Sequence, residues 1–207
     1  MQDAAAKLAV LASGAAPGMR VLDCCAAPGG KSFAAAMQME NTGSILSCDL
    51  HAHKISLIEK CRPARHFHPE GRDSAVRRSL TRRSKRSLTS SSPTCRAPAS
   101  ASSAKSRISA ISRWTPSSAC RTCRRAILET VSRYVKPGGA LLYSTCTVRK
   151  EENEAVALPF LQAHPEFSLE PFPVPDGLDL PNEGYAALLP QKHAADGFFI
   201  CKLRKHA

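Results

Sequence analysis

The segment from residue 20 to residue 49 constrains the fold most, because it places short apolar runs on either side of a glycine-rich loop and a helix-forming run. Residues 20–23 predict a strand, residues 31–39 a helix and residues 43–48 a second strand, which is closed by Asp49. Strands and helices that alternate in this way usually build a parallel sheet covered by helices. We therefore expect an α/β fold with a mostly parallel sheet.

Further elements are expected on both sides of this segment. Residues 4–12 are rich in alanine and leucine and predict a helix. Downstream we expect a helix at 53–60 and a second helix from Arg125, whose apolar face contains Ile127, Leu128, Val131, Tyr134 and Val135. A strand at 140–144 and a helix at 151–161 that is broken at Pro159 should follow. We expect a loop at 171–181 and a terminal antiparallel hairpin of residues 186–189 and 197–203.

The basic charge of the chain is concentrated in one stretch. Residues 61–125 contain 16 Lys and Arg, 2 acidic residues and 15 serines, whereas the rest of the chain contains 13 basic and 15 acidic residues. The formal net charge of +12 therefore comes from a segment whose composition is foreign to its flanks. Composition alone is compatible with a disordered Arg/Ser-rich linker or with an RNA-binding arm.

Composition also limits the class of protein. The 207 residues suffice for one domain with its own core. No apolar run reaches the roughly 18 residues that a membrane span needs, and the first residues lack the basic start of a signal peptide. Nine cysteines without a secretory signal favour a reducing compartment over a disulfide scaffold. We expect a cytoplasmic monomer that does not associate with membranes.

The loop between the first two strands has the pattern of a nucleotide-binding site. A strand that ends in Asp23 is followed by Gly29 and Gly30 and then by a helix, so that backbone N–H groups approach a ligand at the helix N-terminus. Asp49 is suited to bind the two hydroxyls of a ribose. Dehydrogenases and methyltransferases are about equally compatible with this loop, as is a purely structural turn. A P-loop is excluded because its earlier glycine is absent.

A second motif, Ser144-Thr-Cys-Thr147, follows the strand expected at 140–144. It lies at the sheet edge where such folds bind their ligands. Cys146 is a candidate nucleophile, because thiolates attack electron-poor carbon atoms well. The alternative is a buried structural cysteine, which is the commoner role for a single cysteine.

Together the two motifs resemble a known family, the Sun/Fmu (RsmB-like) RNA cytosine-5 methyltransferases. The resemblance covers residues 1–60 and 125–207. The motifs that carry it are VLDCCAAPGGK at 21–31, YSTCT at 143–147, EENE at 151–154, QD at 2–3 and DGFFI at 196–200.

This resemblance implies a Rossmann-like methyltransferase with a C-terminal antiparallel hairpin. The methyl donor would be S-adenosylmethionine, and the acceptor would be carbon 5 of a cytosine in RNA, most often 16S ribosomal RNA, with tRNA or DNA as alternatives. By the same resemblance, Asp49 would hold the ribose, Asp73 would lie near the adenine, and Cys146 would attack C6 of an unstacked cytosine. The residues that would line the cofactor are Cys25, Ala26, Ala27, Pro28, Gly29, Gly30 and Lys31.

The family has a further motif, D-[AV]-P-C-S-G, on a strand between these two, and this chain does not contain it. Its Asp helps to bind cofactor and base, and its Cys helps to release the product. If residues 94–112 are translated one base out of step, the same codons permit DVPCSGLGVIRKKPDIRYK at all 19 positions. We therefore interpret residues 61–71 and 76–124 as out-of-frame translation of a methyltransferase gene.

This interpretation divides the chain into three parts. Residues 1–60 are the N-terminal half of a methyltransferase domain, residues 61–124 a disordered or misfolded segment, and residues 125–207 the C-terminal half. We expect the chain to lack an upstream RNA-binding domain and to be inactive, because the D-[AV]-P-C-S-G strand is absent. The alternative is a non-catalytic basic RNA-binding protein.

No metal site is expected. Cys120 and Cys123 have the spacing of a zinc or redox motif, but a second pair of ligands does not follow at zinc-site spacing. His66 and His68 lie in the segment that we interpret as out of frame.

Overall fold

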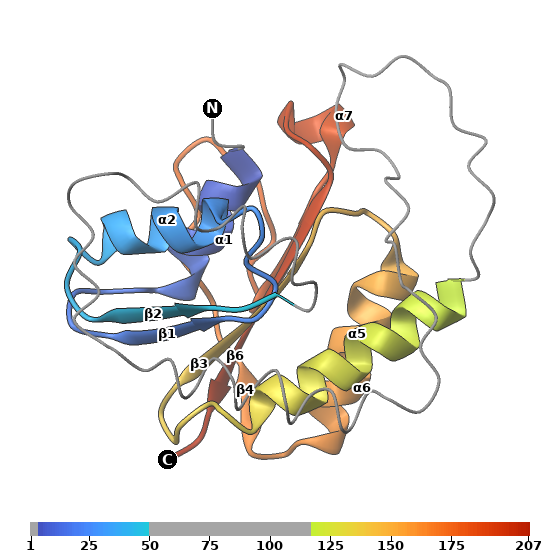
Figure 1. The fold of residues 1–207 in the computed structure, drawn as a ribbon. Coiled ribbons are helices and arrows are strands. Elements are labelled where there is room, and N and C mark those ends of the chain that lie inside the picture. The colour runs from blue at the N-terminus through green and yellow to red at the C-terminus, as the bar shows by residue number, and fades with distance from the viewer. Residues whose placement is uncertain (1–3, 50–116) are drawn as a thin grey trace. The chain divides into compact units, whose positions relative to one another are not determined.

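The computed structural model of the chain describes residues 4–49 and 117–207 (Figure 1). These residues belong to two compact units, one formed by residues 15–49 and the other by residues 4–14 together with 117–207. The helix expected at 53–60 and the site residue Asp73 lie outside the described residues. Within the described ranges, every helix is too short or too polar to cross a bilayer.

The unit of residues 15–49 is the expected strand–helix–strand element. Strand β1 (Arg20–Asp23) pairs in parallel with strand β2 (Ser44–Ser47), and α2 (Gly30–Gln38) connects them. Helix α2 buries a face of small side chains, Ser32, Ala35 and Ala36. The predictions for these three elements are confirmed to within one residue at each end.

The second unit is built around a central strand, β6 (Phe198–Lys205). Strand β3 (Ala140–Thr145) runs antiparallel to it along one edge. Strands β4 (Phe167–Leu169) and β5 (Tyr185–Leu188) pair with different halves of the other edge, both antiparallel. The expected terminal hairpin is confirmed as β5 and β6, with the short helix α7 (Pro190–His193) in the connection. The segment 171–181 forms a loop, as predicted.

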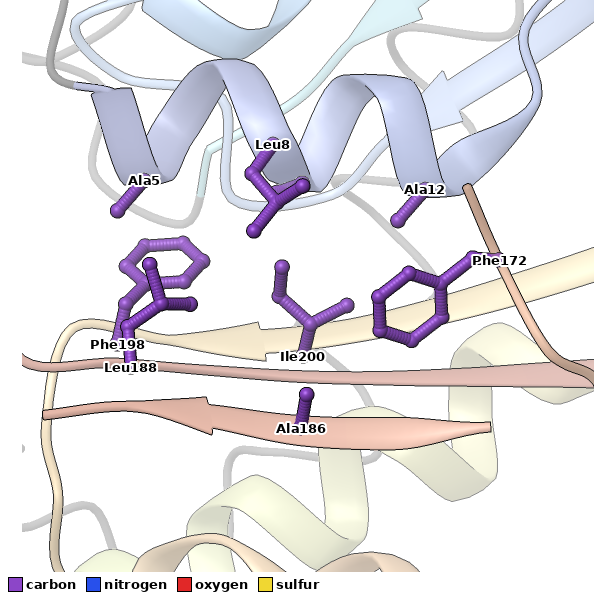
Figure 2. Packing of buried hydrophobic residues seen from close by; sticks show 9 residues of the cluster. Ala5, Leu8, Ala12, Phe172, Ala186, Leu188, Phe198 and Ile200 are labelled. Carbon is purple, nitrogen blue, oxygen red and sulfur yellow. The ribbon is translucent and has the colours of Figure 1, made fainter. Parts of the chain in front are cut away.

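Both faces of this sheet are covered, which explains why residues 198–201 at the start of β6 are all apolar. Figure 2 shows Phe198 and Ile200 of β6 directed toward helix α1 (Ala4–Ser13), where Ala5, Leu8 and Ala12 meet them. The alternate residues Phe199, Cys201 and Leu203 point to the opposite face and pack in a second cluster with residues of α5 (Ser117–Ser132) and α6 (Glu154–Ala163). The five β6 side chains are at most 1% exposed.

Helix α5 (Ser117–Ser132) begins and ends earlier than predicted. Its first half lacks an apolar stripe, so its start could not be recognised from hydrophobic periodicity. Two residues of the expected apolar face are exposed, Ile127 at 38% and Tyr134 at 47%, whereas Leu128 is buried. The helix ends before Tyr134, and therefore a helical face could not extend that far.

The prediction that Pro159 breaks the next helix is wrong. A 3₁₀ turn, η1 (Lys150–Glu152), precedes helix α6 (Glu154–Ala163), and α6 continues through the proline. Proline removes one hydrogen bond to the preceding turn. The side chains of Val156, Ala157 and Phe160 are at most 2% exposed, and their burial outweighs this loss.

His164, directly after α6, joins two elements of the second unit. Its Nε2 lies 2.9 Å from a carboxylate oxygen of Glu129 in α5, and its Nδ1 lies 3.0 Å from one of Glu166. The ring also stacks on Phe160, with centroids 4.2 Å apart. Burial lowers the pKa of His164, but the hydrogen bonds and charges of Glu166 and Glu129 outweigh it, so the pKa is raised overall.

We therefore expect stability to depend on pH through His164. Because its pKa is higher in the folded state, its contribution is complete below the unfolded pKa and disappears as the pH rises through the folded value. Both carboxylates are partly exposed, so the contribution should be about 0.5 kcal/mol. Urea unfolding at pH 6 and pH 8.5 should show this loss in the wild type and not in His164→Gln; equal pH dependence in both chains would contradict the assignment.

Candidate functional site

Asp23, the last residue of β1, holds the glycine-rich loop in place. One carboxylate oxygen accepts a hydrogen bond from the Cys25 backbone N–H at 3.3 Å, and the other accepts one from the Ser32 hydroxyl at 2.7 Å. The Ser47 hydroxyl in β2 donates in turn to Ser32 at 2.9 Å. This chain of hydrogen bonds connects β1, α2 and β2 directly beneath the loop.

The loop itself is compact at its base and open where the helix begins. The Ala26 N–H donates to the Cys48 carbonyl at 2.9 Å. Gly29 has φ 117°, and a Cβ there would meet the Phe33 ring, so a side chain would be strained at this position. At Gly30 a Cβ would find no atom within 4 Å. The space above the first residue of α2 is therefore available to a ligand, as a nucleotide-type cofactor requires.

Two adjacent cysteines in this loop have different surroundings. Burial, together with the nearby groups of Cys25, Cys48 and Asp23, raises the pKa of Cys24 to about 12. Cys24 is therefore a neutral thiol at physiological pH. Cys25 is exposed.

The structure places the predicted cofactor residues at one sheet edge. Residues 25–31 follow β1, and half-buried Asp49 follows β2 after one intervening residue. Because β1 and β2 are parallel, their carboxyl ends are adjacent. The Cys48 N–H donates to the Asp23 carbonyl at 2.7 Å, which joins the two ends directly. Asp73 lies outside the described residues, and the roles of all these residues remain predictions.

Cys146 belongs to the other unit and follows β3. It is exposed, whereas its neighbours Thr145 and Thr147 are buried, with 3% and 6% exposure. The Thr145 hydroxyl donates to Oδ1 of Asn153 at 2.5 Å, and Nδ2 of Asn153 donates to the Thr147 carbonyl at 2.9 Å. The Cys146 side chain thus lies on a turn that is fixed on both sides by hydrogen bonds.

Glu152 reinforces the segment that carries Asn153. Its carboxylate is buried and lies 2.8 Å from Nη2 of Arg124 and 3.8 Å from Nη1 of Arg149. Its backbone carbonyl accepts a hydrogen bond from the Tyr143 hydroxyl of β3 at 2.6 Å. Helix α5, strand β3 and the turn before α6 are therefore connected next to the Cys146 turn.

Sequence reasoning did not anticipate the supporting residues Ser32, Ser47 and Asn153. The two serines had no pattern that separates them from other serines. Asn153 lies in the EENE motif, but it is eight positions away from Thr145, and the sequence gave no sign of a direct contact. In residues 4–49 and 117–207, His, Cys, Asp and Glu side chains form no group of three that could hold a metal.

The sequence of the chain is similar to those of known methyltransferases. A family model described as 16S rRNA methyltransferase RsmB/F matches residues 10–204. Probable ribosomal RNA small subunit methyltransferase B of Bacillus subtilis is 35% identical over 197 residues, which are 89% of this chain and 43% of that protein. Ribosomal RNA small subunit methyltransferase F of Escherichia fergusonii is 32% identical over 211 residues, 95% of this chain and 42% of that protein. The chain spans about two fifths of the length of these relatives.

Solved structures show the same fold. NSun6 from Pyrococcus horikoshii, crystallised with SFG, has a TM-score of 0.69 and 23% sequence identity, and the match covers 100% of this chain and 53% of that one. The expected Rossmann-like α/β class is thereby confirmed. Because the family model spans nearly all of its length, the chain belongs to the 16S rRNA methyltransferase RsmB/F family.

Proposed function

We propose that the described parts of this chain come from an enzyme that methylates carbon 5 of a cytosine in small-subunit ribosomal RNA. The observation that carries this proposal is Cys146, an exposed thiol between two buried threonines at the carboxyl end of β3. A nucleophile needs access to its substrate and a fixed direction, and this turn provides both. The relatives named as small-subunit rRNA methyltransferases support the choice of substrate.

In the proposed reaction, the Cys146 thiolate forms a bond to C6 of the cytosine, which makes C5 nucleophilic. S-adenosylmethionine would supply the methyl group that C5 takes up and would leave as S-adenosylhomocysteine. Transfer of the C5 proton to a base would then expel the Cys146 thiolate and restore the aromatic ring. The cytosine must leave its stack for Cys146 to reach C6.

The cofactor would be held by residues 25–31 and Asp49. The open space above Gly30 and the ordered loop base at Asp23 fit a nucleoside-type ligand. A structural relative was crystallised with SFG, an analogue of S-adenosylmethionine, which supports the same choice. Asp73 would lie near the adenine, as the family pattern implies.

We further infer that the chain itself does not complete this reaction. The D-[AV]-P-C-S-G motif is absent from the sequence, and with it the groups that help to bind the base and release the product. Residues 61–71 and 76–124 are interpreted as out-of-frame translation. Resequencing the source DNA tests this directly, and an uninterrupted open reading frame through codons 61–125 would refute it.

Cofactor binding is tested by calorimetric titration with S-adenosylmethionine. We expect the chain to bind it, and Gly30→Val to weaken binding at least tenfold, about 1.4 kcal/mol, by filling the space above α2. The melting temperature should change little, because a Cβ at Gly30 meets no atom within 4 Å. Met37→Val, on the exposed side of the same helix, is the control and should bind like the wild type.

Two results would contradict this proposal. If Gly30→Val binds the cofactor as well as the wild type does, the ligand lies elsewhere. If the chain binds no cofactor but binds RNA with a strong salt dependence, it is a non-catalytic RNA-binding protein instead.

A further inference from the structure

Asn153 makes the two hydrogen bonds that fix the turn around Cys146. It accepts from the Thr145 hydroxyl at 2.5 Å and donates to the Thr147 carbonyl at 2.9 Å. The side chain is 1% exposed, so water does not compete for either bond. The Thr147 hydroxyl in turn accepts from the Arg149 N–H at 3.2 Å, which extends the fixed segment past Cys146.

The chemistry of these partners requires an amide. A carbonyl oxygen such as that of Thr147 only accepts hydrogen bonds, so the group facing it must donate. The opposite atom of the same side chain must accept from the Thr145 hydroxyl. Asparagine carries a donor and an acceptor at this spacing, whereas an ionised aspartate carries only acceptors.

The backbone of Asn153 fixes this residue at the start of helix α6. Its carbonyl accepts hydrogen bonds from the N–H groups of Val156 and Ala157, both at 3.0 Å, and so begins helix α6. Those two residues are at most 1% exposed and belong to the cluster under the sheet. The turn that carries Cys146 is therefore connected through Asn153 to the core of its unit.

We propose that Asn153 is a positioning residue for Cys146, which holds the thiol in its exposed place by bridging Thr145 and Thr147. This role rests on the proposed function of Cys146 as the nucleophile. Asn153 acts through the threonines and is not itself expected to touch the substrate.

The test measures alkylation of Cys146 by iodoacetamide in the full chain, with each cysteine quantified by peptide mass spectrometry. Cys25, exposed and in the other unit, is the reference in the same sample. The Cys146-to-Cys25 rate ratio should fall at least threefold in Asn153→Ala at both pH 8 and pH 5.5. Glu151→Gln, exposed and close in sequence, is the control and should keep the wild-type ratio.

Asn153→Asp separates positioning from a general structural effect. At pH 8 its ratio should fall like that of Asn153→Ala. At pH 5.5 a buried carboxyl group is protonated, so it both donates and accepts and replaces the amide. The ratio of this variant should then return to that of the wild type at the same pH, whereas Asn153→Ala stays low.

The proposal is overturned if either variant keeps or exceeds the wild-type ratio at pH 8, or if Asn153→Asp stays low at pH 5.5. Should Asn153→Ala fail to fold, the isosteric Thr145→Val removes the 2.5 Å hydrogen bond to Asn153, together with the longer 3.5 Å contact to the Thr147 carbonyl, and should lower the ratio at both pH values. Alkylation does not depend on methyl transfer, so these results stand apart from whether Cys146 is the nucleophile.

Discussion

Replacing Glu170 with glutamine is expected to lower the free energy of unfolding by about 2 kcal/mol at neutral pH. Glu170 forms paired hydrogen bonds with Arg204 and lies 2.8 Å from the ammonium of Lys202. The Lys202 side chain is only 6% exposed, so the substitution leaves a buried charge without its counterion. Removing one partner of a buried pair is costly for this reason.

The shift in the pKa of Glu170 leads to a similar magnitude for the loss in stability. Hydrogen bonds from Arg204, and secondarily from Lys202, lower it from 4.5 to about 2 against the opposing effect of burial. That shift corresponds to about 3 kcal/mol at 1.36 kcal/mol per unit. The carboxylate side chain is 24% exposed, and solvent screening reduces the expected cost to about 2 kcal/mol.

Urea unfolding measures this effect and its pH dependence. Because the folded pKa is depressed, the contribution is present above the unfolded pKa of 4.5 and is lost as the pH falls toward about 2. The difference between wild type and Glu170→Gln should therefore shrink in acid. Glu183→Gln, an exposed carboxylate in the same unit, should change stability by less than about 0.5 kcal/mol. Equal stability of Glu170→Gln and wild type at pH 7 would show that the pair does not stabilise the fold.

Much of the described fold could be predicted from local patterns. The strands β1 and β3 are short apolar runs bounded by residues of a different type, and the glycine-rich loop indicates the start of α2. The terminal hairpin of residues 186–189 and 197–203 could also be predicted. Each of these patterns lies within a short stretch of neighbouring residues, so it can be recognised in a single sequence without knowledge of tertiary contacts.

The errors have a different cause, because they depend on contacts between distant parts of the chain. Pro159 predicted a break, but α6 is stabilised by burial against a cluster that no local pattern reveals. The early start of α5 likewise has no apolar signature, and its Arg124 is fixed by an ion pair to Glu152, 28 residues away. The pair of Glu170 with Lys202 spans a similar separation and could not be recognised in advance.

The candidate site shows the same difference between residues that local patterns predict and residues that only long-range contacts reveal. Sequence motifs predicted Cys146 and the loop residues 25–31 as candidates, because the proposed chemistry restricts which residues can occupy those positions. The residues that hold them, Asp23 with Ser32 and Asn153 with its threonines, are recognisable only in three dimensions.

Restoring the reading frame is expected to have the largest effect on activity. Single-base corrections at the boundaries of residues 61–71 and 76–124 would replace the Arg/Ser-rich stretch by one that contains D-V-P-C-S-G. By the family resemblance, this would return an Asp that helps to bind cofactor and base and a Cys that helps to release the product. We expect methyl transfer to appear in the restored chain from a level indistinguishable from background in the present one.

Cys146→Ala in the restored chain tests the nucleophile. Without the thiol, C6 has no attacking group and C5 does not become nucleophilic, so turnover should fall by a factor of about 10³ or more. The matched control is Cys201→Ala, a buried cysteine of β6 that faces the core. Its substitution should affect stability but leave turnover measurable.

The most direct measurement is transfer of a radiolabelled methyl group from S-adenosylmethionine to unmodified small-subunit rRNA by the present chain, the restored chain and the restored chain with Cys146→Ala. Our account predicts incorporation by the restored chain alone. Turnover by the present chain that depends on Cys146, or turnover by the restored chain that survives Cys146→Ala, would contradict it.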